Sequence, residues 1–109
     1  MAKGPESKVR KKVHHCLAGM GAYYFPPVTN GYGRSGVPDV VGCHRGVFFG
    51  IECKASGNTP TPLQRLELRR IGDAGGIALV IDETNVEQLV NTLTGEIARI
   101  LGERHASDD

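Results

Sequence analysis

The chain has 109 residues, of which 39% are hydrophobic and 23% are charged. This length allows one domain of ordinary size and excludes a multidomain protein, while the composition is typical of a globular chain and not of a disordered one. No apolar run approaches the roughly 20 residues of a membrane span, and no apolar signal-peptide core follows the basic N-terminus, so we expect a soluble cytoplasmic protein with no membrane partner.

The net charge of +1 conceals two halves of opposite sign. Residues 1–54 carry eight Lys or Arg and three acids, a balance of +5, whereas residues 55–109 carry five Lys or Arg and nine acids, a balance of −4. A basic half favours a polyanionic partner such as nucleic acid. Its three acids, Glu6, Asp39 and Glu52, are isolated among positive charges and therefore need an explanation.

The first predicted element is a helix over Pro5–Gly19, in which Val9, Val13 and Leu17 recur at helical spacing and basic residues occupy the other faces. A short strand over residues 22–25 and an irregular Gly- and Pro-rich loop over residues 26–38 follow. Residues 39–43 and 47–54 are rich in β-branched and aromatic side chains and are separated by a turn, which predicts a β-hairpin.

The second half of the chain predicts a helix, a strand and a helix. Thr61 and Gln64 form a capping box that starts the helix after the hairpin, and Gly75 and Gly76 end this helix. The strand covers Ile77–Ile81, and a second capping box at residues 84–87 opens the last helix, whose end we expect to fray from residue 102 to residue 109. This order predicts one α/β domain, residues 1–109, with a mixed sheet covered by helices.

The hairpin brings two carboxylates together. Side chains alternate along a strand, so Glu52 and Lys54 share one face, while the hairpin places Asp39 opposite Glu52. Two close carboxylates repel each other unless a cation lies between them, and their oxygens suit Mg²⁺ or Mn²⁺. Lys54 beside such an ion could activate water or neutralise charge on a phosphate, which indicates phosphodiester hydrolysis.

These residues resemble the PD-(D/E)XK nuclease signature. Pro38-Asp39, twelve residues, and then Glu52-Cys53-Lys54 carry the resemblance, together with Gln64 in the next helix and Glu6 in the first. The sequences of three segments are similar to those of the virus-type replication-repair nuclease (VRR-NUC) domain, which occurs alone in phages: Gly36–Asp39, Glu52–Lys54 and Pro62–Gln64. The arginine-containing sequence that this resemblance leads us to expect after Gly76 does not appear at residues 77–82.

The resemblance implies a restriction-endonuclease-like fold and a Mg²⁺- or Mn²⁺-dependent, structure-selective deoxyribonuclease similar to Holliday-junction resolvases. It also implies that Asp39, Glu52 and the Cys53 carbonyl bind the metal, and that Lys54 and Gln64 position water or Lys54 itself. Glu6 would contact metal or water. Other interpretations stay open: Gln64 completes a capping box, Glu6 suits a helix dipole, and Glu52 with Lys54 can form a plain ion pair.

Basic residues and tyrosines are candidate DNA contacts. The first helix carries Lys8, Arg10, Lys11 and Lys12 without compensating acids, and Arg34 and Ser35 precede Asp39. Tyr23, Tyr24 and Tyr32 can stack on bases or pack in the core. One active site cuts one strand, whereas resolving a four-way junction takes two cuts. We therefore expect a homodimer, with its contact at the last helix or at the segment 23–27. A monomeric flap nuclease and a DNA-binding module that does not cut are the alternatives.

Overall fold

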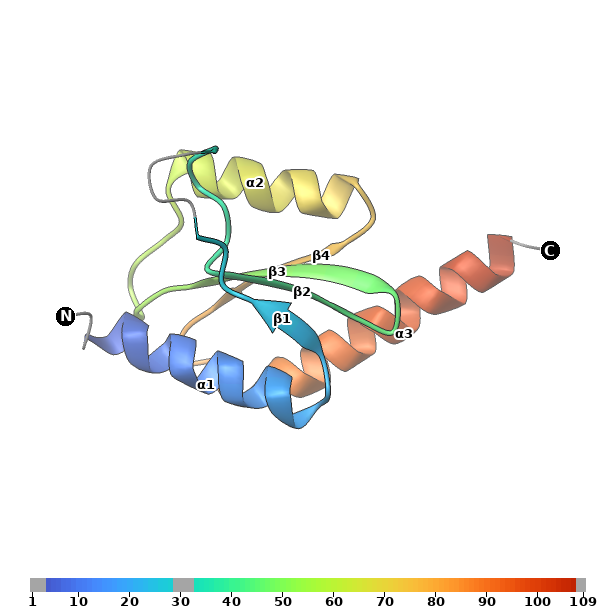
Figure 1. Cartoon of the computed structure of the whole chain (residues 1–109), viewed down its shortest axis with the longest axis horizontal. Helices are drawn as coiled ribbons and strands as arrows, with labels where there is room; N and C mark the ends of the chain where they lie inside the picture. Colours follow the sequence, from blue (N-terminus) through green and yellow to red (C-terminus); the bar gives the residue numbers. More distant parts are fainter. Residues whose placement is uncertain (1–3, 29–32, 108–109) are drawn as a thin grey trace.

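The computed structural model describes residues 4–28 and 33–107 and shows one mixed sheet between helical layers (Figure 1). In chain order the elements are α1 (Pro5–Gly19), β1 (Tyr23–Phe25), β2 (Val40–His44), β3 (Val47–Cys53), α2 (Pro62–Asp73), β4 (Ile77–Ile81), the short 3-10 helix η1 (Val86–Gln88) and α3 (Leu89–Ser107). The predicted α/β architecture is therefore confirmed. None of the helices described is both long and apolar enough to cross a membrane.

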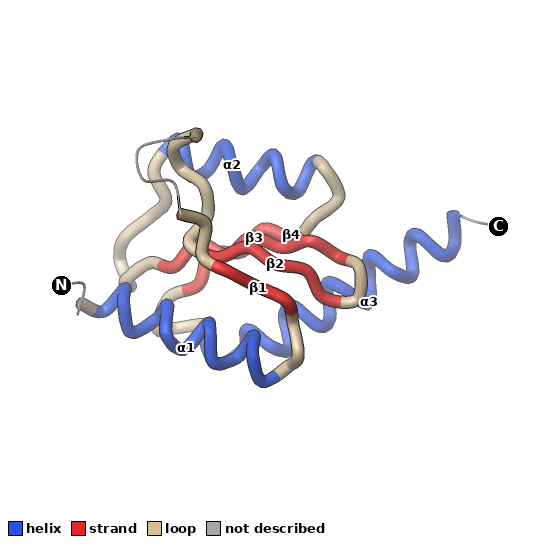
Figure 2. Tube along the Cα trace, in the orientation of Figure 1, coloured by secondary structure: helices blue, strands red, loops and turns tan. Residues whose placement is uncertain are grey.

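The sheet has the strand order β1-β2-β3-β4. Strands β1, β2 and β3 pair antiparallel, whereas β3 and β4 pair parallel, because α2 carries the chain back across the sheet between them. The helices α1 and α3 lie against one face of the sheet, and α2 lies against the other (Figure 2). The mixed sheet flanked by helices matches the prediction.

The hydrophobic core lies between the sheet and the α1–α3 layer. Its strand residues alternate, so that Val47, Phe49, Ile51 and Cys53 of β3 are all fully buried on this face. The helices contribute one row of apolar side chains each, at the spacing expected for one helical face: Val9, Val13 and Leu17 from α1, and Leu89, Leu93, Ile97 and Ile100 from α3. The apolar stripe of the last helix is thus core and not a free surface.

On the opposite face, α2 packs closely because glycines face it. A Cβ atom at Gly50 would lie 2.5 Å from Cδ1 of Ile71, and a Cβ atom at Gly36 would lie 2.6 Å from the carbonyl carbon of Leu63. Gly36 also has a φ of +84°, which only glycine adopts readily. Both β3 and the loop before Asp39 therefore pack directly against α2.

Two predictions for the second half of the chain are wrong. Thr84 does not cap the last helix: its hydroxyl and backbone N–H both bond to the Asp82 carboxylate, and the Asn85 side chain bonds to the Asp82 N–H instead. The competing acid two residues earlier therefore turns the predicted capping box into a turn followed by η1. Helix α3 also continues past Gly102 to Ser107, where Arg104 donates to the Gly46 carbonyl at 3.2 Å.

Candidate active site

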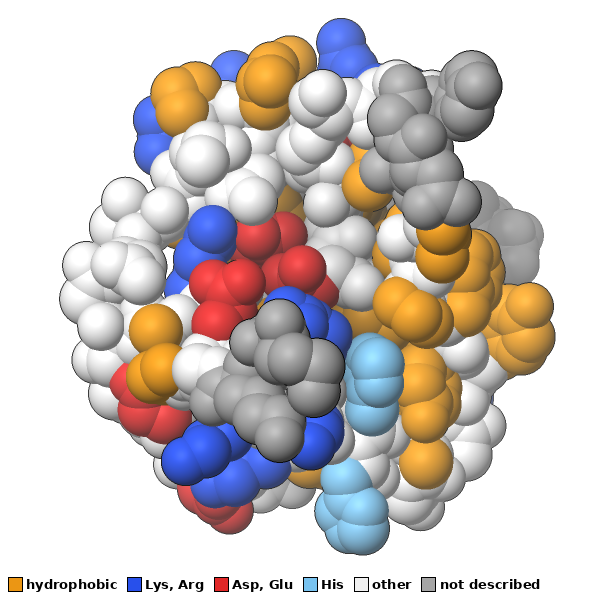
Figure 3. All heavy atoms as spheres, turned by 60° about the vertical axis from the view of Figure 1, so that its left-hand side comes forward, with side chains coloured by type: hydrophobic (Ala, Val, Ile, Leu, Met, Phe, Trp, Pro, Cys, Tyr) orange, Lys and Arg blue, Asp and Glu red, His pale blue; other side chains and the backbone are white. Residues whose placement is uncertain are grey.

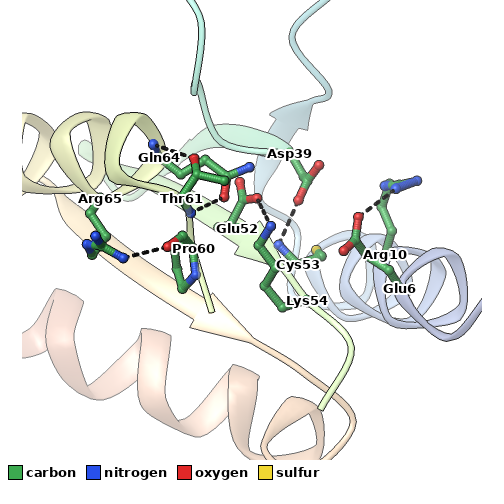
Figure 4. Close-up of polar contacts among 10 residues, drawn as sticks. All are labelled: Glu6, Arg10, Asp39, Glu52, Cys53, Lys54, Pro60, Thr61, Gln64 and Arg65. Atoms are coloured by element: carbon green, nitrogen blue, oxygen red, sulfur yellow. Dashed lines mark hydrogen bonds and ion pairs between the residues drawn. The ribbon is translucent and has the colours of Figure 1, made fainter. Parts of the chain in front are cut away.

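The β2–β3 hairpin places Asp39 beside Glu52, as predicted. Arg45 and Gly46 form a two-residue turn with positive φ values of 53° and 80°. Val40 pairs with Ile51 at the far end of the hairpin, so the same register places Asp39 opposite Glu52. The Asp39 Oδ2 atom accepts a hydrogen bond of 2.7 Å from the Cys53 N–H (Figure 4). This bond fixes the Asp39 carboxylate at the end of β3.

Glu52 is a buried carboxylate in an acidic neighbourhood. Its residue exposure is only 2%. The pKa of Glu52 is raised from its ordinary 4.5 to about 7, chiefly by burial, next by the charge of Asp39 and least by that of Glu6. A site that holds a buried carboxylate next to a half-buried one favours the binding of a cation.

Lys54 lies on the same face as Glu52, as the strand alternation predicts. Its Nζ atom is 3.5 Å from Glu52 Oε2, and its side chain is only 13% exposed. The Lys54 backbone N–H donates to the Ile81 carbonyl at 2.9 Å, which ties the end of β3 to β4. The Lys54 charge opposes the rise in the pKa of Glu52 but does not cancel it.

Gln64 takes part in the predicted capping box and also reaches the site. Its Oε1 atom accepts from the Thr61 N–H at 2.9 Å, and the Gln64 N–H donates to Thr61 Oγ1 at 3.2 Å. Gln64 also lines a cavity of about 420 Å³ together with Asp39. The capping role is therefore shown, and Gln64 faces the same cavity as Asp39.

Glu6 lies in the first turn of α1 near these carboxylates. Its Oε2 atom is 3.9 Å from an Nη atom of Arg10, one turn further along the helix. Figure 3 shows a face of the molecule on which several acidic side chains gather next to Lys and Arg side chains. Both arrangements for Glu6 stay open, because an acid in the first turn also suits the helix dipole.

The predicted DNA contacts divide into two groups. Arg10, Arg34 and Ser35 line the same cavity as Asp39 and Gln64, so the structure brings them to the site. Lys8 and Lys12 instead line a second cavity next to Glu83, and Lys11 lines a third beside Glu87. The basic helix thus presents one arginine to the site and its lysines to other parts of the surface.

The tyrosines also divide. Tyr24 is half-buried, and its ring lies 5.4 Å from that of His14, so it packs against α1. Tyr23 is 69% exposed on the edge strand and contacts Phe25 edge to face. Tyr32 lies outside the described residues.

The donor set fits a hard divalent cation with an open coordination shell. Within residues 4–28 and 33–107, no three His, Cys, Asp or Glu side chains gather closely enough to hold a metal. Asp39 and Glu52 supply two carboxylates, and water and phosphate oxygens commonly complete the octahedron around Mg²⁺ at such sites. The raised pKa of Glu52 supports this fit, because a bound cation would offset both the burial of the charged carboxylate and its repulsion by Asp39.

Cys53 contributes to the candidate active site through its backbone and not through its thiol. Its side chain is fully buried in the core, and burial raises the pKa of the thiol to about 12. A thiol with that pKa is protonated at neutral pH and is a poor nucleophile. The Cys53 N–H orients Asp39, which leaves the carbonyl as the only group of this residue suited to a metal.

A second buried acid, Glu67, was not predicted. It lies one turn after Gln64 on α2 and is 5% exposed, with Oε1 3.3 Å from Arg34 Nε and Oε2 3.1 Å from Arg70 Nη1. Its position three residues after Gln64 and four before Ile71 places it on the inward row of the helix. That spacing was the available signal, but an acid on a charged helix normally indicates a solvated face.

Comparisons with known proteins agree with this geometry. No protein-family model matches the chain. A solved structure described as a VRR_NUC domain has a TM-score of 0.68 to this chain at 27% sequence identity, and the match covers 80% of this chain and 95% of the other. The chain has the fold of a VRR_NUC domain. The predicted resemblance and the restriction-endonuclease-like fold class are therefore confirmed.

A phage protein shares part of the sequence of this VRR_NUC-like chain. It is named "Putative nuclease p44", from Acyrthosiphon pisum secondary endosymbiont phage 1, and is 37% identical over 59 residues. Those residues are 53% of this chain and 63% of the phage protein, so the match spans less than two thirds of that relative.

Proposed function

We propose that this VRR_NUC-like domain is a metal-dependent DNA endonuclease. The observation that carries the proposal is the buried Glu52 next to Asp39, with Lys54 3.5 Å from Glu52 and arginines lining the adjoining cavity. Carboxylates, a lysine and flanking cations are the groups that phosphodiester hydrolysis requires. The VRR_NUC structure and the phage relative named as a nuclease support the same activity.

Asp39, Glu52 and the Cys53 carbonyl are the groups that would hold Mg²⁺ or Mn²⁺. A bound ion of this kind supplies a Lewis acid that lowers the pKa of water and offsets the charge of the phosphate. In hydrolysis the water oxygen joins the phosphorus, the bond from phosphorus to the leaving oxygen breaks, and a proton ends on that oxygen. The site therefore needs a group that handles protons or charge at the phosphate, and the proposal gives this role to Lys54, whose Nζ atom is 3.5 Å from Glu52.

The other predicted residues support this chemistry from the rim of the site. Gln64 is held by the Thr61 cap and lines the cavity that contains Asp39, where it can orient water. Glu6 and Arg10 face each other from α1, and Arg10, Arg34 and Ser35 can bind the phosphates on either side of the cut. Lys8, Lys11 and Lys12 would extend the contact along α1 by charge alone.

We further propose that the substrate is branched DNA and that the domain acts as a homodimer. One set of carboxylates cuts one strand, and a four-way junction needs two opposed cuts, which a twofold pair supplies. Because the stripe of α3 is buried in the core, the edge strand β1 is the remaining candidate for the contact. Tyr23 and Phe25 there are 69% and 46% exposed.

The decisive experiment is a cleavage assay. Labelled four-way junction, flap, duplex and single-stranded DNA are incubated with the protein in Mg²⁺, in Mn²⁺ and in EDTA. We expect metal-dependent cutting of branched substrates, and Lys54→Met should slow single-turnover cleavage by about 100-fold or more while leaving the fold intact.

Each alternative has its own outcome in that assay. Binding of all substrates without cutting in either metal would overturn the nuclease proposal in favour of a DNA-binding module. Cleavage of flaps alone, by a protein that sediments as a monomer, would leave a flap nuclease and overturn the junction proposal. An unchanged Lys54→Met rate would reduce Lys54 to an ion-pair partner of Glu52.

A further inference from the structure

The α2 face of the sheet is only partly covered. Helix α2 packs on β3 and β4, whereas β1 and β2 extend beyond it. Phe48, on the same face of β3 as Gly50, is 46% exposed, and Val41 of β2 is half-buried. An apolar floor with an aromatic ring is therefore open to solvent beside the helix.

This floor belongs to a groove that continues from the candidate active site. The groove has a volume of about 350 Å³, and Val41, Phe48 and Ile71 form its apolar part. Arg34, Val37 and Pro38 line both this groove and the cavity that contains Asp39. A strand that passes Asp39 can therefore enter the groove without leaving the protein surface.

Two arginines line the groove, and a buried acid holds them there. Glu67 accepts a 3.1 Å bond from Arg70 and lies 3.3 Å from Arg34, and all three residues line the groove. Glu67 itself is only 5% exposed, whereas the side chains of Arg34 and Arg70 are 70% and 56% exposed. The carboxylate thus orders two guanidinium groups that still face solvent.

We infer that this groove binds an unpaired DNA strand that adjoins the scissile phosphate. A single strand offers flat apolar bases and regularly spaced phosphates, and proteins bind it with an aromatic or apolar platform beside a row of cations. Phe48 and Val41 supply the platform, and Arg34 and Arg70 supply the cations. A blunt duplex keeps its bases stacked inside and gains nothing from the apolar floor. The inference rests on the proposed nuclease function and names the part of a branched substrate that this region selects.

The test compares two DNA probes without metal. One is a labelled duplex with a single-stranded arm, and the other is the same duplex with blunt ends; binding is measured by fluorescence anisotropy in EDTA at several salt concentrations. Phe48→Ala should weaken binding of the armed duplex by roughly 5- to 100-fold, the scale of one lost base stack, and leave the blunt duplex unchanged. Arg70→Ala should also reduce the salt dependence for the armed duplex by about 0.7 in slope.

Matched controls come from the outer part of α2. Leu66→Ala removes an exposed apolar side chain and Arg69→Ala removes an exposed arginine, and neither residue lines the groove. Both variants should bind the two probes like the wild type. Circular dichroism of every variant confirms that the fold is kept.

Three results would overturn the inference. If Phe48→Ala weakened binding of both probes equally, the groove would bind duplex DNA and not an unpaired strand. If it weakened binding of neither probe, the groove would not bind DNA. A Phe48→Ala variant that keeps its DNA affinity but dissociates from dimer to monomer would assign the groove to a second copy. A wild type that prefers the armed duplex yet cuts nothing in Mg²⁺ or Mn²⁺ would refute the proposed function and leave the groove standing.

Discussion

The two faces of the sheet are built on opposite principles. The face under α1 and α3 is closed and largely apolar, with Phe49 and Ile51 fully buried. The face under α2 is partly open and contains the two buried acids, Glu52 and Glu67, that the structure describes. Burial of apolar area stabilises the first face, whereas burial of charge costs free energy on the second. Stability and the proposed chemistry are therefore carried by different sides of the same four strands.

The neighbouring residues Phe48 and Phe49 give the strongest test of this division. Phe49→Ala should lower the free energy of unfolding by about 3–5 kcal/mol, because it empties the closed core. Phe48→Ala, one residue away on the open face, should lower it by less than about 1 kcal/mol. Urea unfolding of both variants measures the difference. Similar losses would show that the two faces contribute alike to stability.

The carboxylates give the converse test. Asp39→Asn and Glu52→Gln should each slow cleavage by about 100-fold or more, since each removes a charge proposed to bind the metal, while the fold is kept. Asp73→Asn, an exposed acid at the end of α2, is the matched control and should cut like the wild type. Single-turnover assays at saturating Mn²⁺ measure the rates. Near wild-type cleavage by either site variant would place the metal elsewhere.

The pH dependence of stability sharpens the same contrast. The folded protein raises the pKa of Glu52 from 4.5 to about 7, so it prefers the protonated carboxyl. That preference stabilises the fold fully below about pH 4.5 and is lost as the pH rises through about 7. Glu52→Gln lacks the titrating group, so the wild type should lose stability relative to this variant across that range. Urea unfolding in EDTA from pH 4.5 to 8 measures it, and parallel curves would contradict it.

Glu67→Gln should destabilise the fold less than Phe49→Ala does. Glu67→Gln removes the charge that holds Arg34 and Arg70, and we expect a loss of about 1–2 kcal/mol, the scale of a hydrogen bond between charged groups. Both arginines are largely exposed and regain water, which limits the cost. Glu87→Gln, an exposed acid of η1, serves as the control in thermal unfolding. A loss equal to that of Phe49→Ala would mean that Glu67 is a core element.

Local patterns predicted most of the fold because few alternatives competed with them. The bounds of α1 and β4 match the predicted ranges, and the two-residue turn put Asp39 opposite Glu52 as alternation requires. The capping boxes show where such patterns fail. Thr61 caps α2, but the similar motif at Thr84 does not cap a helix, because Asp82 competes for the same groups.

Long-range neighbours account for what the sequence could not predict. Glu67 is buried with two arginine partners, and one of them, Arg34, comes from a distant loop. The last turns of α3 form where Arg99 bridges Glu96 and Glu103, and where Arg104 reaches Gly46, 58 residues earlier. The lysines of α1 looked equivalent to Arg10 by charge, and only the packing of the helix separates them.

The hairpin turn determines where this domain tolerates changes in length. An inserted residue within β2 or β3 would shift the alternation and send one of the two carboxylates to the opposite face of the sheet. An insertion between Arg45 and Gly46 can be absorbed by a longer loop without altering the pairing of Val40 with Ile51. Related chains are therefore expected to vary the spacing from Asp39 to Glu52 at this turn alone. A search that allows a gap there, and nowhere else in the hairpin, would find distant members that a fixed spacing of twelve residues would miss.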